Sequence, residues 1–152
     1  MYKSFRKIVK FTVITSFIFA SNTSTIAAKC SVTSNTLSFG AYDVFSSSPL
    51  TSTGSIQVRC SPGTTPYTVS LNNGLYGPIT QRKMKNTTGT QTMEYNLYTD
   101  ATYSVVWGDG TGGGVVVRSD KPDNLTVYGQ IPPQQDIPIG TYTDVITVTV
   151  SF

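Results

Sequence analysis

Apolar and polar residues alternate in short stretches throughout the sequence after residue 30, and this period of two limits the fold more than any other feature. The alternation is clearest near the C-terminal end, where threonines and a serine separate the apolar positions. Those positions are Tyr142, Ile146, Val148, Val150 and Phe152. Such alternation places side chains on the two opposite faces of a β-strand. No segment keeps the 3.6-residue period of an amphipathic helix, so the sequence predicts an all-β protein.

Four earlier stretches also place apolar residues on one face of a strand, and they cover residues 56–60, 67–71, 93–97 and 125–131. A first strand region, residues 32–39, contains Val32, Leu37 and Phe39. Turn-forming residues separate them, for example Ser61-Pro62-Gly63 and Asn72-Asn73-Gly74. Several short strands at this spacing are typical of a β-sandwich.

The last predicted strand, Tyr142–Phe152, extends to the final residue. An Ig-like sandwich ordinarily has one further strand after a sixth strand of this kind. The pattern therefore favours an incomplete sandwich that lacks its last strand and leaves a sheet edge and a core groove uncovered. Such edges pair readily with another chain. The pattern alone equally allows a complete, less regular sandwich whose first strand region covers the gap.

The first 28 residues have the order of a secretory signal peptide. Four basic residues precede an apolar run of about ten to thirteen residues, and small residues ending at Ala27-Ala28 follow. The apolar run is shorter than the roughly 20 residues that a membrane-spanning helix needs. We therefore expect a cleaved signal at 1–28, one domain at 29–152, and no transmembrane segment after cleavage.

Removal of the signal changes the charge balance. Four of the eleven basic residues and none of the eight acidic ones lie before residue 28, so seven basic and eight acidic residues remain. No basic patch for nucleic acid is left. The one basic cluster, Arg82-Lys83-Met84-Lys85, is expected to be a solvated turn.

Export also predicts the state of the two cysteines. Two thiols in an oxidising compartment ordinarily pair, so we expect a structural disulfide between Cys30 and Cys60.

The residue inventory argues against an enzyme. The chain has no histidine, which removes Ser-His-Asp and Cys-His catalysis and His-ligated metal sites. No acid/base, nucleophile or metal-ligand set can be assembled from the scattered carboxylates. We therefore expect no catalytic residues, no metal and no cofactor.

One aromatic and apolar stretch beside the glycine-rich turn at 108–114 allows two interpretations. Tyr103, Val105 and Trp107 could form an exposed patch that binds a surface or a sugar. The alternative is that these side chains belong to the buried core.

An ordered set of motifs over residues 30–152 resembles the spore coat protein U-like domain family, which includes the Csu-type (archaic) chaperone–usher pilus subunits. The motifs are Leu37-Ser38-Phe39-Gly40, residues 54–60, 93–100, 107–111, 126–132 and 140–152. The resemblance implies an incomplete Ig-like sandwich held in the periplasm by a chaperone that lends a strand. An outer-membrane usher then exchanges that strand for the N-terminal extension of a neighbouring subunit. In this family the C-terminal strand is the main contact of the chaperone. The resemblance therefore implies a chaperone and donor-strand interface at Tyr142, Ile146, Val148, Val150 and Phe152. It also makes the Phe152 carboxylate a candidate for capture by basic residues of the chaperone.

The sequence departs from the pattern of polymerising subunits in one respect. Those subunits carry a donor segment before the first cysteine, whereas here the expected cleavage lies one or two residues from Cys30. The chain is therefore expected to accept a strand without donating one. The predicted function is a structural or adhesive subunit of a surface pilus or fimbria that serves attachment and biofilm formation. The alternative is a secreted spore or cell coat protein that folds as a self-complete monomer.

Overall fold

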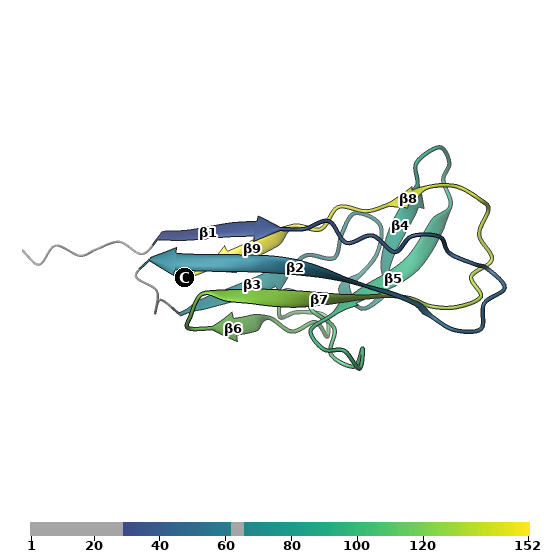
Figure 1. The fold of residues 1–152 in the computed structure, drawn as a ribbon. Helices are drawn as coiled ribbons and strands as arrows, with labels where there is room; N and C mark the ends of the chain where they lie inside the picture. Colours follow the sequence, from purple (N-terminus) through teal and green to yellow (C-terminus); the bar gives the residue numbers. More distant parts are fainter. Residues whose placement is uncertain (1–28, 62–65) are drawn as a thin grey trace, which may run out of the picture.

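A computed structural model of the chain describes residues 29–61 and 66–152 (Figure 1). The predicted signal peptide at 1–28 lies outside the described residues, so its cleavage stays a prediction. One short 3-10 helix, η1, spans Ile79–Gln81. The strands are β1 (Lys29–Ser34), β2 (Leu50–Ser61), β3 (Tyr67–Leu71), β4 (Arg82–Asn86), β5 (Thr92–Tyr98), β6 (Val117–Ser119), β7 (Asp123–Ile131), β8 (Tyr142–Thr143) and β9 (Val148–Ser151). Within these two described ranges no helix has the length and apolar character needed to span a membrane.

The strands form two sheets, which confirms the predicted all-β sandwich. A six-stranded sheet has the order β1-β2-β7-β5-β4-β8, and a three-stranded sheet has the order β6-β3-β9. In Figure 1, β9 and β3 of the three-stranded sheet are drawn behind β1, β2 and β7, and β6 is drawn below β7. All the pairings between named strands are antiparallel.

The core lies between the two sheets and follows the predicted alternation. Ile56, Val58 and Cys60 of β2 are buried, while Gln57 and Arg59 between them face away. On β3 the buried positions are every second residue, and the same holds for most of β5 and β7. A strand with one buried face alternates apolar and polar residues, and this alternation can be seen in a sequence. The sequence therefore predicts β2, β3, β5 and β7.

One glycine on β7 lets the segment after β1 cross the sheet. A Cβ atom at Gly129 would lie 2.8 Å from the Phe39 ring and 3.0 Å from the Leu37 side chain. Both side chains pack against the core although they lie outside the strands. The predicted strand region at 32–39 is therefore a strand only as far as Ser34, and the chain then runs over β7 as a cover.

The prediction of one continuous strand at Tyr142–Phe152 is wrong, because the two ends of this segment are hydrogen-bonded to different sheets. Tyr142 and Thr143 pair with β4 in the six-stranded sheet, whereas Val148–Ser151 pair with β3 in the other sheet. Residues 144–147 carry the chain from one sheet to the other. The alternation of half-buried and exposed side chains continues without a break over this crossing, so the sequence pattern gives no sign of the change of sheet.

The predicted disulfide is confirmed. Cys30 of β1 and Cys60 of β2 are bonded, and they are directly opposite each other in the antiparallel pairing.

Candidate strand-accepting groove

A groove of about 1110 Å³ opens between residues 34–45 and residues 137–148, neither of which is continuous strand. Its floor consists of core side chains from the two sheets. They are Leu71, Met84, Met93, Tyr95, Leu97, Val127 and Ile131. Well-packed interiors leave few voids larger than a water molecule, and small-molecule pockets measure about 300–1,000 Å³. A space of this size over the core is therefore a part of the sandwich that the described residues leave uncovered.

The groove lies beside a strand edge without a partner. β9 pairs with β3 from Leu71↔Val148 to Thr68↔Ser151, and no described residue pairs with its other edge. β1 is likewise the end strand of the six-stranded sheet. Ser34 at the end of β1 and Val148 at the start of β9 line the same groove. The expected open edge is thus present in the part of the chain that the structure describes.

The structure brings three of the five predicted interface residues together in this groove: Tyr142, Ile146 and Val148. Val150 packs against the core further along β9, outside the groove lining. Phe152 follows the end of β9 and is largely exposed. Their role at an interface stays a prediction.

Sequence reasoning missed the opposite wall. Leu37, Phe39 and Tyr42 line the groove from the segment after β1. The sequence predicts a strand over residues 32–39, and the alternative of a complete sandwich places that strand over the gap. No sequence signal indicates that residues 37–42 form one wall of an open groove.

Apolar side chains also stand exposed on the rim. Phe45 is 88% exposed, Ile139 is fully exposed, and Val145 is largely exposed, and all three line the groove. Exposed apolar side chains that continue an uncovered core mark a surface that a partner can cover.

Tyr42 attaches the wall after β1 to the segment that follows β7. Its hydroxyl donates to the Pro132 carbonyl (2.8 Å) and accepts from the Gln135 N–H (2.9 Å). These bonds join the wall after β1 to the segment that follows β7.

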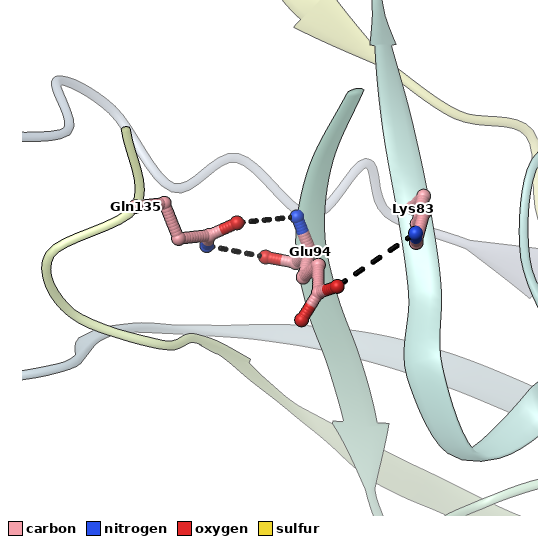
Figure 2. Close-up of polar contacts among 3 residues, drawn as sticks. All are labelled: Lys83, Glu94 and Gln135. Atoms are coloured by element: carbon pink, nitrogen blue, oxygen red, sulfur yellow. Dashed lines mark hydrogen bonds and ion pairs between the residues drawn. The ribbon is translucent and has the colours of Figure 1, made fainter. Parts of the chain in front are cut away.

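Gln135 in turn attaches that segment to β5 (Figure 2). Its Oε1 accepts from the Glu94 N–H (2.7 Å) and its Nε2 donates to the Glu94 carbonyl (2.9 Å). β5 and β7 pair as far as Asn96 and Gln130, and the same register two residues further on would place Pro132 opposite Glu94. Proline has no backbone N–H, so it cannot donate a hydrogen bond to β5 at that position. The Gln135 amide therefore completes the backbone bonding of β5 where β7 ends. The nearby Lys83–Glu94 ion pair, at 3.7 Å, is partly exposed and contributes little.

Asp144 fixes the other wall at the point where the chain leaves β8. Its Oδ2 accepts from the Tyr95 hydroxyl (2.7 Å), and its Oδ1 accepts from the N–H groups of Leu75 (2.9 Å) and Val145 (2.8 Å). Burial, together with the hydrogen bond to Asp144, raises the pKa of Tyr95 above its ordinary value. The phenol therefore stays protonated and donates at all physiological pH values.

Arg82 corrects the expectation of a solvated turn at 82–85. This residue begins β4 and is completely buried. Its guanidinium donates to the carbonyls of Asn72 (3.0 and 2.7 Å) and Trp107 (2.8 Å) and to Oδ1 of Asn96 (2.7 Å). Burial lowers the pKa of Arg82, but the ordinary value is so high that the side chain stays charged. A buried charge of this kind is tolerated because its donors are hydrogen-bonded.

We expect Arg82→Met to lower the free energy of unfolding by about 2–3 kcal/mol, because it leaves the Asn72 and Trp107 carbonyls buried without donors, each at a cost of about 1–1.5 kcal/mol. Urea unfolding followed by tryptophan fluorescence measures the change. Lys83→Met on the outward face of β4 is the matched control and should stay within about 0.5 kcal/mol of the unaltered chain. Equal stability of the two variants would contradict a structural role for the Arg82 hydrogen bonds.

The predicted surface patch is wrong for Trp107, which is 1% exposed. Its indole N–H donates to the Val69 carbonyl (3.0 Å), so its ring fills the core and its polar atom is satisfied there. Tyr103 is half-buried and stands edge-on to Tyr98 and Tyr128, while Val105 is partly exposed. Trp107 therefore belongs to the buried core and is not part of an exposed patch.

The described residues contain no group of three or more His, Cys, Asp or Glu side chains placed to hold a metal ion. The features that distinguish this surface are instead the groove and the unpaired edge of β9.

These features define a class: a disulfide-linked β-sandwich with an uncovered groove beside an edge strand. The sequence model of the Spore Coat Protein U domain matches residues 15–149, and the chain belongs to this family. The family resemblance read from the motifs is therefore confirmed.

Among the known proteins to which it is similar are a bacterial Protein U and a chain of a pilus assembly complex. Protein U of Myxococcus xanthus is 34% identical over 143 residues, which cover 84% of this chain and 79% of that protein. A chain in the crystal structure of the CsuC–CsuE chaperone–tip adhesion subunit pre-assembly complex, from the archaic chaperone–usher Csu pili of Acinetobacter baumannii, is 29% identical with a TM-score of 0.57. That match covers 83% of this chain but only 40% of the other, so this chain spans less than half of its structural neighbour.

Proposed function

We propose that this chain is a structural or adhesive subunit of a bacterial chaperone–usher pilus and that it completes its fold by accepting a donor strand. The observation that supports this proposal is the groove beside the unpaired edge of β9, floored by the protein's own core side chains. A ten-residue strand that inserts four apolar side chains would contribute about 6–12 kcal/mol of gross burial free energy. Backbone bonds to the free edge of β9 would add to it.

The proposed partners are a periplasmic chaperone, an outer-membrane usher and neighbouring pilus subunits. The similarity to a chain of a chaperone–subunit complex supports the chaperone and the subunit. The proposed route is export through the periplasm to the cell surface, where the subunit serves attachment and biofilm formation.

The test is expression of the exported chain in a periplasm, with and without a chaperone from the same bacterium. We expect soluble protein only as a one-to-one complex, because the free groove exposes apolar core. Size-exclusion chromatography with light scattering measures the stoichiometry. A stable monomer that unfolds cooperatively without a chaperone would contradict the proposal.

That contrary result would favour the second candidate, a secreted spore or cell coat protein that folds as a self-complete monomer. The Spore Coat Protein U family, together with the match to Protein U, of which this chain covers 79%, supports the coat-protein part of this candidate.

A further inference from the structure

The turn after β3 holds the chain segment that leads into β9. Asn72 extends the β3–β9 pairing, since its N–H donates to the Thr147 carbonyl (3.2 Å) and its Oδ1 accepts from the Thr147 N–H (2.9 Å). Three residues later, the Leu75 N–H donates to Oδ1 of Asp144 (2.9 Å). Both ends of residues 144–147 are thus bonded to one turn, residues 72–75.

The turn has a fixed shape of its own. Gly74 has a φ of +76°, and a Cβ atom there would lie 2.0 Å from Oδ2 of Asp144. The Gly74 N–H donates to Oδ1 of Asn72 (3.2 Å). The buried Arg82 guanidinium donates two hydrogen bonds to the Asn72 carbonyl. The turn is therefore anchored in the core and fits Asp144 only with glycine at position 74.

The segment that the turn holds is a wall of the groove. Asp144, Val145 and Ile146 line the groove, whereas residues 72–75 do not. An uncovered apolar groove favours inward movement of its walls, because such movement buries apolar surface. Among the described residues, only β3 pairs with β9 and resists this movement. Inward movement of residues 144–147 would break the bonds to Asn72 and Leu75.

We propose that turn 72–75 is a latch that holds wall 144–147 in its strand-accepting position before a donor strand arrives. Asn72 and Gly74 are positioning residues, since they act on the wall and lie outside the groove lining. The inference rests on the proposed function, and it identifies the contacts that keep the groove open before a donor strand binds. A preformed site lowers the ordering cost of binding, so the latch sets how fast the chain takes up a strand.

Three variants separate the latch from general stability. Asn72→Ala removes the Oδ1 acceptor of Thr147. Asn72→Asp keeps an acceptor oxygen at the same place, because no described bond uses the Asn72 amide nitrogen as a donor. Asn73→Ala removes a neighbouring bond, Nδ2 to the Gly77 carbonyl (2.8 Å), and leaves the wall untouched.

The first readout is amide hydrogen exchange on the exported chain. Where it purifies with its chaperone, it is released from the complex immediately before the measurement, so that the groove is free. In Asn72→Ala we expect the Thr147 amide to exchange about tenfold faster, which corresponds to one lost hydrogen bond. The β2–β7 amides should be unchanged, whereas a merely structural defect would accelerate them as well. Asn72→Asp and Asn73→Ala should match the unaltered chain at Thr147.

The second readout is uptake of a fluorescein-labelled twelve-residue peptide of alternating valine and threonine. We expect Asn72→Ala to take up the peptide about tenfold more slowly, and Asn72→Asp to restore the rate. Unchanged Thr147 exchange in Asn72→Ala, or unchanged uptake despite faster exchange, would overturn the latch. Absence of uptake by the unaltered chain would count against the proposed function, and the exchange experiment would then decide the latch alone.

Discussion

Replacing Val148 by aspartate is expected to abolish the one-to-one complex with the chaperone. Val148 is the first residue of β9, is half-buried and lines the groove. A strand laid along β9 would bury the new carboxylate against apolar side chains without a basic partner. Burying an unpaired charge costs several kcal/mol, so we expect the affinity to fall more than about 100-fold. Co-purification and isothermal titration measure the loss.

Two further variants separate interface loss from misfolding. Thr149→Asp places the same charge on the exposed face of β9 and should retain the complex. Val148→Ala keeps an apolar side chain with a smaller contact area and should weaken the complex about tenfold, in line with the loss of two methyl groups. Retention of the complex by Val148→Asp, or equal loss in Thr149→Asp, would contradict a donor strand on the groove side of β9.

Much of the sandwich is readable in the sequence because its strands have one buried face. The buried residues of β3, and most of those of β5, recur at every second position, and burial on one face dictates that spacing. The apolar positions of the last alternating segment were readable for the same reason, because Tyr142, Ile146, Val148 and Val150 all pack against the core.

The change of sheet between β8 and β9 was not predictable, because long-range contacts determine it. Asp144 occupies a position where the alternation would place an apolar side chain. It is accepted there because the Tyr95 hydroxyl and the Leu75 N–H, 49 and 69 residues away along the chain, donate to it. The alternation determines which side chains of a segment face the core. The hydrogen-bond partners of the segment determine the sheet to which it belongs.

Arg82 shows the same limit for a charged residue. A cluster of three cations in four residues ordinarily marks a solvated surface, and Lys83 and Lys85 do face outward on β4. Arg82 is buried because four oxygens from segments before and after it converge on its guanidinium. They are the carbonyls of Asn72, Ile79 and Trp107 and Oδ1 of Asn96. Only the folded chain brings these acceptors together, so composition and spacing could not reveal the site.

Removing the disulfide with the double substitution Cys30→Ser and Cys60→Ser is expected to lower the free energy of unfolding by about 3.7 kcal/mol, the loop-closure value for a loop of about 30 residues. The bond joins β1 to β2 across a separation of 30 residues. Five of the six residues of β1 are exposed, so packing contributes little to holding this edge strand in place. Because β1 ends at the groove, its release also removes part of the surface that a donor strand would cover.

Urea unfolding of the purified chain or complex measures this effect, and reduction of the unaltered protein with dithiothreitol should produce a shift of the same size. Ser31→Ala is the matched control on β1, since its hydroxyl makes only a long, exposed bond of 3.4 Å to the Arg59 carbonyl. It should stay within about 0.5 kcal/mol of the unaltered chain. A double serine variant within about 1 kcal/mol of the unaltered protein would mean that the β1–β2 backbone bonds alone secure the strand, because the cross-link would then add less than a single buried hydrogen bond.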